Sequence, residues 1–477
     1  MRVPAPLFIS VALLVLGGCQ AQAPTPPTAP LSAAETSLGV LPDGVDHQPL
    51  PDRWWSLYRD PQLDQLVERA LQHNQDLAQT DAHLKALMAG VRQQQAALWP
   101  STEVQAGVPY GRSSDDQVLA EARDGHAANH WETALGFDLA WQLDLYGQLH
   151  AAIAAAQASV EAQTAARDQL RLGIAAQTSQ AYIDLCSFTA RQAVLQQSLD
   201  NLASSLRLTE RQHQGGVATA LDSHRLQVLA SRTRAELPWL QARQQMAAFS
   251  LAQLTGQANA PAEPCQQLPS LNAALPSGEA WHLLQRRPDI RQAERQWLAA
   301  HWRAEQVRGD LYPQVSLGAT LNTASQHLDG LGDSRALSFG VGPLIRWRFP
   351  NRAANRARLA AADAEREASL AAWRSSVLSA LKDVRSALAR YAGERQRAQT
   401  LDQAAQQSHE AFELAERGYR AGSLDGLQQL DAQRELIAAQ AQQVEARQRQ
   451  AHSEIALFQA LGGGWQAPDS LTPKEHP

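Results

Sequence analysis

The feature that most constrains this chain is an internal duplication. LWPSTEVQAGV at residues 98–108 matches LYPQVSLGATL at 311–321, and ERQHQGGVATALDSHRLQ at 210–227 matches ERGYRAGSLDGLQQLDAQ at 416–433. A repeat of roughly 200 residues is too long for a solenoid unit, so it indicates two copies of one half-protein. The predicted halves are residues 56–265 and 266–461, and a C-terminal tail occupies 462–477.

Each half contains one segment in which apolar residues alternate with polar or small ones. The apolar positions are Leu135, Phe137, Leu139, Trp141 and Leu143 in the first half, and Phe339, Val341, Pro343, Ile345, Trp347 and Phe349 in the second. This pattern is typical of a membrane-barrel strand with lipid on one side and water on the other, and also of a half-buried sheet in a soluble domain. Weaker partner strands before each segment and polar loops between them predict two hairpins, 101–145 and 313–349.

Two hairpins supply four strands, which cannot close a barrel. Open sheet edges are not tolerated in lipid, and small membrane barrels need at least about eight strands. Closure therefore requires several copies of the chain. With four strands from each copy, the barrel can have eight, twelve or sixteen strands.

Long helices are predicted after the hairpins, at residues 147–214 and 353–420. These segments are nearly free of proline and rich in Ala, Gln, Leu and Arg, and a helix of this length extends about 100 Å. Apolar residues at three-four spacing indicate packing against partner helices. The shorter return segments are expected to stack end to end, 217–256 with a helix at 277–309 and 424–461 with a helix at 62–98, and the loops between them to form a belt. Pro238 is expected to bend the first return helix.

A glycine-containing tip joins each long helix to its return helix. The tips are residues 213–222, with Gly215, Gly216, Thr219 and Asp222, and residues 419–428, with Tyr419, Gly422, Asp425 and Gly426. Gly216 corresponds to Gly422 in the repeat. Because glycine readily adopts positive φ, we expect the chain to reverse at both places.

The N-terminus indicates export. Residues 1–18 carry one arginine and a short apolar run, which fits a signal peptide, and Leu16-Gly17-Gly18-Cys19 resembles the bacterial lipobox, in which the cysteine is acylated. A lipid on Cys19 would anchor a Pro- and Ala-rich tether at 19–55. A plain signal peptide with a chance cysteine is the alternative. Cys186 and Cys265 can form one bridge or none.

Several classes of function are disfavoured. The formal net charge of −6 argues against a nucleic-acid partner, which requires a basic face. The sequence contains none of the common hydrolase, phosphate-loop or paired-cysteine motifs, so we expect no enzyme, and apart from the lipid we expect no cofactor. Three methionines and scattered histidines indicate no metal site.

The mature chain as a whole resembles the TolC-like outer-membrane factors, specifically the NodT-type lipoproteins of efflux pumps. The resemblance rests on six short segments in the right order: DRWWSLYRDPQLDQLVERAL, WQLDLYG, RRPDIRQAE, LYPQVSLGA, LDAQREL and ALGGGW. It implies a mixed α and β fold: a homotrimer whose 12-stranded outer-membrane β-barrel, with four strands from each chain, continues into a periplasmic tunnel of twelve helices. Its implied partners are outer-membrane lipid, a periplasmic adaptor that docks on the tips, and an inner-membrane pump of the resistance-nodulation-division type.

The resemblance also implies a gate at the second tip, where a tyrosine, a glycine and a following acid match Tyr419, Gly422 and Asp425. In some relatives the acid stands one position earlier, where this chain has Leu424. Three copies of Asp425 would favour cations at a constriction, although Asp425 can equally cap the returning helix. The implied function is passive small-molecule efflux. A type I protein-secretion channel and a periplasmic coiled-coil scaffold or adaptor are the alternatives.

Overall fold

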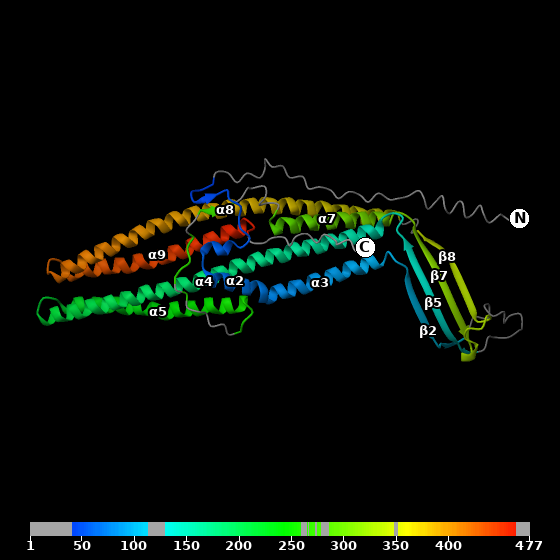
Figure 1. Cartoon of the computed structure of the whole chain (residues 1–477), viewed down its shortest axis with the longest axis horizontal. Coiled ribbons are helices and arrows are strands. Elements are labelled where there is room, and N and C mark those ends of the chain that lie inside the picture. The colour runs from blue at the N-terminus through cyan, green and yellow to red at the C-terminus, as the bar shows by residue number, and fades with distance from the viewer. Residues whose placement is uncertain are drawn as a thin grey trace. The chain divides into compact units, whose positions relative to one another are not determined.

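The computed structural model describes residues 41–112, 129–258, 265, 267–271, 274–277, 286–347 and 352–463. The described residues form two units: one holds those within 84–162 and 293–373, and the other holds those within 41–83, 163–292 and 374–463. The predicted signal peptide, Cys19 and most of the tail and tether lie outside the described residues. The predicted combination of helices and strands is confirmed (Figure 1).

The first unit contains a four-stranded antiparallel sheet in the order β2-β5-β7-β8. Its strands are β2 (Ser101–Gly107), β5 (Thr133–Leu143), β7 (Gln314–Ser325) and β8 (Leu337–Arg346). Each predicted hairpin supplies one neighbouring pair, and β5 and β7 join the two halves of the repeat. A separate two-residue pairing links β3 (Tyr110–Gly111) and β4 (His130–Trp131).

The register places apolar residues on one face of this sheet. Val104 pairs with Phe137, Phe137 with Leu321, and Leu321 with Phe339. In the next row toward the start of β2, Glu103 pairs with Asp138, Asp138 with Thr320, and Thr320 with Gly340. Successive rows point to opposite faces, so the period-two pattern of the sequence becomes one apolar face and one polar face.

Most of the helices are long. They are α2 (Pro61–His73), α3 (Gln75–Ala96), α4 (Gln148–Gln214), α5 (Ala220–Leu254), α7 (Pro288–Gly309), α8 (Arg352–Arg420) and α9 (Gly426–Ala460). In the first unit, side chains join helix ends near the strands: Gln148 Nε2 donates to Asp310 Oδ1 at 2.7 Å, and Asn355 Nδ2 donates to the Asp310 carbonyl at 3.2 Å. The rings of Trp297 and Trp373 stack at 6.4 Å.

The second unit packs parts of α4, α5, α8 and α9 with the N-terminal segment around one hydrophobic core. The apolar stripe of α8 contributes Val384, Leu388 and Tyr391 to this core. The short 3-10 helix η2 (Trp54–Tyr58) joins it as well, and there Trp54 stacks on Phe458 of α9 at 4.9 Å. Pro238 lies inside α5, which continues past it.

Two expected helices are corrected by the structure. The helix expected over 62–98 is interrupted at Asn74, whose backbone is extended and whose side-chain oxygen accepts the N–H groups of Asp76 and Leu77 at the start of α3. Its Nδ2 group also donates to the Leu254 carbonyl at 3.1 Å, so a tertiary contact holds the break. The helix expected from 277 is interrupted at Arg287, after which α7 begins at Pro288, because proline suits the first position of a helix; residues 278–285 lie outside the described residues.

A short parallel strand pairing precedes that helix. Strand β6 (Leu275–Pro276) pairs in parallel with β1 (Val45–Asp46), and Ser277 donates through both its backbone N–H and its hydroxyl to the Asp46 carbonyl. A disulfide joins Cys186 of α4 to Cys265. The bridge that the sequence left open is therefore present, and it fastens the end of the first half to a long helix.

Candidate functional site

The first tip, between α4 and α5, is built by glycine and by a capping residue. Gly216 has φ 76°, and the Val217 N–H reaches back to the Gln212 carbonyl at 2.8 Å, which is the bond that closes a Schellman turn. Gly215 precedes the turn and is exposed. Thr219 then caps α5, and its side chain accepts from the Asp222 backbone N–H.

The second tip, between α8 and α9, repeats this geometry. Gly422 has φ 74°, and the Ser423 N–H reaches the Gly418 carbonyl at 2.9 Å. Asp425 caps α9, accepting the Gln428 N–H at 2.8 Å, while the Gln428 side chain accepts the Asp425 N–H at 3.3 Å. The duplication seen in the sequence is thus a duplication of turn chemistry.

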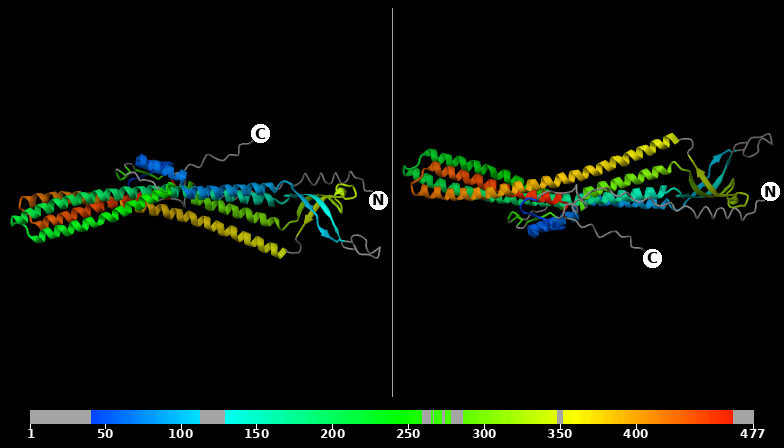
Figure 2. Two further views of the ribbon diagram at one scale, coloured as in Figure 1. Left: turned by 90° about the horizontal axis from the view of Figure 1, so that it is seen from below. Right: turned by 90° about the horizontal axis from the view of Figure 1, so that it is seen from above.

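The two tips lie together at one end of the second unit (Figures 1 and 2). Tyr419 is buried, and its hydroxyl lies 3.2 Å from the Thr209 hydroxyl on α4. A β-carbon added at Gly426 would lie 3.6 Å from the Tyr419 ring and 3.8 Å from the Asp222 carboxyl carbon. Leu202, Leu226 and Leu430 form a small buried cluster from three helices behind the tips. Seven of the eight predicted tip residues therefore take part in the turns, the caps or the contact between the two tips, and Gly215 is the exception: Gly216, Thr219, Asp222, Tyr419, Gly422, Asp425 and Gly426.

Each capping box contains one carboxylate, but at a different position. In the first box the acid is Asp222, three residues after the cap, and in the second it is the cap Asp425 itself. The Thr219 hydroxyl and N–H both donate to Asp222 Oδ2, at 2.6 and 3.0 Å. These hydrogen bonds, the hydroxyl first, lower the pKa of Asp222 against the opposing effect of burial. Asp425 is exposed, so its carboxylate caps the helix and also faces solvent.

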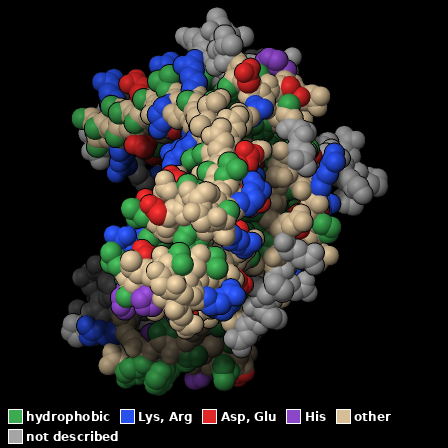
Figure 3. All heavy atoms as spheres, turned by 90° about the vertical axis from the view of Figure 1, so that its left-hand side faces the viewer, with side chains coloured by type: hydrophobic (Ala, Val, Ile, Leu, Met, Phe, Trp, Pro, Cys, Tyr) green, Lys and Arg blue, Asp and Glu red, His purple; other side chains and the backbone are tan. Residues whose placement is uncertain are grey.

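Apolar side chains are exposed at the tips. Val217 is 80% exposed, Leu221 56% and Leu427 44%. On the face of the molecule toward which the tips point (Figure 3), charged side chains of both signs are interspersed with uncharged ones. Exposed apolar groups inside a polar surround are typical of protein-interaction surfaces.

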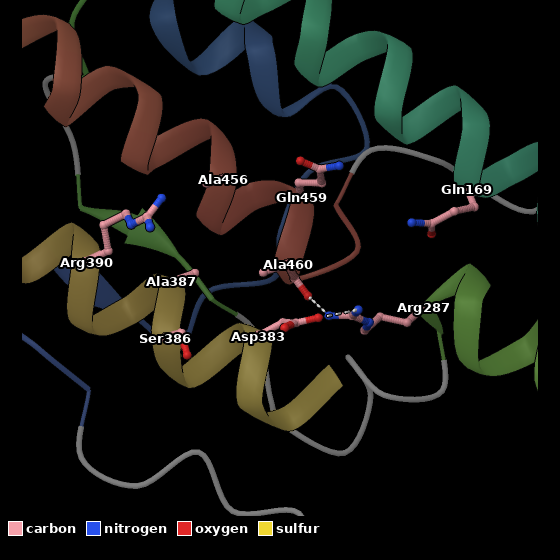
Figure 4. A pocket seen from close by; sticks show the side chains of 9 residues that line it. All are labelled: Gln169, Arg287, Asp383, Ser386, Ala387, Arg390, Ala456, Gln459 and Ala460. Atoms are coloured by element: carbon pink, nitrogen blue, oxygen red, sulfur yellow. Dashed lines mark hydrogen bonds and ion pairs between the residues drawn. The ribbon is translucent and has the colours of Figure 1, made fainter. Parts of the chain in front are cut away.

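Two of the sequence segments that carried the family resemblance meet in the second unit. Arg287, from RRPDIRQAE, is buried; its guanidinium donates to both carboxylate oxygens of Asp289 and to the Ala460 carbonyl, and lies 3.9 Å from Asp383 (Figure 4). Gly462, from ALGGGW, has φ 66°, and a β-carbon there would lie 2.9 Å from Arg287 Cγ. These segments hold the end of α9 against the start of α7, so their role is structural.

The buried acid Glu454 was not singled out from the sequence. It is 2% exposed; the Tyr58 hydroxyl donates to Oε2 at 3.0 Å, and the Gln450 amide donates to Oε1 at 2.9 Å. Burial raises the pKa of Glu454 to about 7, although both hydrogen bonds and Arg395 oppose the shift. Burial, followed by the neighbouring Glu454, also raises the pKa of Tyr58 well above its usual value. The sequence signal that could have identified Glu454 is that it is the one acid beside the apolar residues near the end of α9.

Neither a metal centre nor a membrane helix emerges from the described residues. Within them, no three His, Cys, Asp or Glu side chains are grouped so as to hold a metal ion. None of the described helices combines the length and hydropathy that a membrane-spanning helix requires.

Known proteins share this architecture along nearly the whole chain. The family model described as "Outer membrane efflux protein" matches residues 66–257 and 282–463. The pyoverdine export outer membrane protein OpmQ of Pseudomonas putida is 34% identical over 99% of this chain and 100% of its own length, and OprJ of Pseudomonas aeruginosa is 30% identical over 99% and 98%. The solved structure of the outer-membrane channel OprN superposes with a TM-score of 0.84 at 32% identity, covering 94% of this chain and 99% of that one.

The duplicated helices, the sheet with one apolar face and these similarities define an outer-membrane channel protein. The chain belongs to the outer membrane efflux protein family. It is a conduit of an efflux system located in the outer membrane, as predicted, and its family is one of channels rather than enzymes.

Proposed function

We propose that three copies of this chain form the exit duct of a tripartite efflux system. The observation that carries the proposal is the sheet of the first unit. Its apolar face is open to solvent in the single chain, with Phe339 79%, Val341 81% and Ile345 67% exposed, and β2 and β8 are its edges. Lipid would cover that face, and neighbouring copies would pair the edges, giving twelve strands.

The tips are the part of the duct that meets the periplasmic partners. We assign adaptor docking to the exposed apolar groups Val217, Leu221 and Leu427, held in place by the turns at Gly216 and Gly422. An inner-membrane pump of the resistance-nodulation-division type would supply the energy, because a passive channel has no energy source of its own. Asp425 would add one carboxylate per chain near the mouth, in addition to capping α9.

The cargo is proposed to be small molecules. A relative that is 34% identical is named for pyoverdine export, which favours this class over secreted proteins. Acylation of Cys19 would add a lipid anchor to the barrel, and the tether at 19–55 would link the anchor to the belt.

Fractionation of cells that express the full-length protein tests the assembly. We expect a trimer in outer membranes that dissociates only on heating, and recovery of a soluble or inner-membrane monomer would contradict the proposal. For the tips, Val217→Cys should cross-link to a periplasmic adaptor when the pump genes are co-expressed. The matched variant Leu378→Cys, an exposed position on α8 far from the tips in the sequence, should not.

A further inference from the structure

A cavity of about 310 Å³ opens between α4, α5 and α9, away from both tips. Its walls include Val194 and Leu195 of α4, Leu229 of α5, and Ile437 and Val444 of α9. These five side chains are only partly buried, so apolar surface lines a hollow that the single chain leaves open. A volume of this size is at the lower end of those that hold small ligands.

Charges at the cavity are predominantly positive. Arg191, Arg232 and Arg434 line it together with one acid, Glu236. The guanidinium of Arg191 lies 5.7 Å from the centre of the Trp239 ring, and this cation-π contact holds its head group in place. Arg434 lies 3.8 Å from the exposed Asp431. Apolar walls with excess guanidinium groups complement a ligand that has an apolar body and a negative charge.

The larger cavity of Figure 4 has a different character. It measures about 360 Å³ and includes Arg287, Asp383, Arg390 and Gln459 in its lining. Arg287 is already engaged by Asp289, the Ala460 carbonyl and Asp383. Its buried cation is therefore satisfied within the chain, and that cavity serves the structural junction described above.

We propose that the cavity between α4, α5 and α9 is a binding site for a small amphiphilic anion, whose apolar body packs on Leu229 and Ile437 and whose carboxylate or sulfonate is held by Arg191 and Arg232. Guanidinium groups present paired N–H donors that match the two oxygens of such a group. The site uses neither the tips nor the barrel, so it stands apart from the duct proposal.

Calorimetric titration of the purified full-length protein in a non-ionic amphipol tests the site. The probes are 2-naphthalenesulfonate and 2-naphthylmethylammonium, which share an apolar body and differ in charge. We expect the sulfonate to bind at least tenfold more tightly than the ammonium compound. The double substitution Arg191→Gln and Arg232→Gln should weaken sulfonate binding at least tenfold, whereas Arg207→Gln, at an exposed arginine of α4 outside the cavity, should leave it unchanged.

A second variant tests the apolar half of the site. Ile437→Trp places a larger side chain in the hollow and should abolish saturable binding of the sulfonate. If that variant fails to fold, the double arginine variant still tests the site, because Arg191 is only partly buried and Arg232 is exposed, so their replacement leaves the core intact. Three results would each overturn the proposal. They are equal affinity for both probes, no saturable binding because another chain fills the cavity, and unchanged sulfonate binding in the arginine variant.

Discussion

Replacing Glu454 with glutamine is expected to remove a pH dependence of stability. The carboxyl of Glu454 has a pKa of about 7 in the folded chain, against 4.5 as the ordinary value. At a pH between 4.5 and about 7, the folded chain keeps a proton on Glu454 that the unfolded chain has released. The free energy of unfolding contributed by this group is therefore largest below pH 4.5, and it falls as the pH rises to about 7.

The size of the effect follows from the shift. A difference of about 2.5 pKa units corresponds to about 3 kcal/mol, and solvent screens this side chain little because it is 2% exposed. Glutamine keeps the shape and cannot ionise. The contact with Tyr58 can persist, since a hydroxyl both donates and accepts.

Thermal unfolding, followed by tryptophan fluorescence between pH 4.5 and 8, measures how the stability depends on pH. The midpoint of the wild-type protein should fall more steeply with rising pH than that of Glu454→Gln. Glu435→Gln, at an exposed position on the same helix, should behave like the wild type. Parallel curves for the wild type and Glu454→Gln would contradict this expectation, because they would show that the buried carboxyl does not titrate in this range.

Three further predictions concern the disulfide and the tips. Cys186→Ser with Cys265→Ser should lower the free energy of unfolding by about 4 kcal/mol, since the bridge spans 79 residues; reductant should destabilise the wild type alone, and an equal response from the variant would count against the bridge. Asp425→Ala should cost about 1 kcal/mol by removing a helix cap, whereas Asp425→Asn should retain the cap and lose the charge; unchanged cation selectivity of Asp425→Asn in planar bilayers would limit Asp425 to capping. Tyr419→Phe should lower the free energy of unfolding by about 1 kcal/mol through the lost contact with Thr209. If the effects of Tyr419→Phe and Thr209→Ala simply add in the double variant, the two side chains are not coupled and this expectation is contradicted.

The parts of the fold that were readable from the sequence depend on local signals. The long helix expected at 147–214 lies at Gln148–Gln214, because Ala, Gln, Leu and Arg favour helix throughout it. Gly216 and Gly422 could be read as turns, since positive φ is a property of the residue itself. Alternation along β5 and β8 survives as one apolar face because side chains on a strand have a strict period of two.

The parts that were missed depend on tertiary contacts. The break at Asn74 is held by the Leu254 carbonyl, which comes 180 residues later, and no local pattern encodes that partner. The Cys186–Cys265 bridge, which the sequence left open, depends on where the end of the first half packs. The two capping boxes carry their acid at different positions, and aligning Thr219 with Asp425 in the repeat predicts this difference. The burial of Glu454 has no such local signal, because it depends on the tertiary packing around α9.

As an outer-membrane channel, the folded protein conducts across a membrane. The current through planar lipid bilayers that contain the purified, heat-dissociable protein tests this conduction directly. We expect discrete channel events of one unit size that disappear when the protein is dissociated by heating before reconstitution. Intact, correctly assembled protein that inserts into the bilayer and produces no channel events would contradict this conclusion.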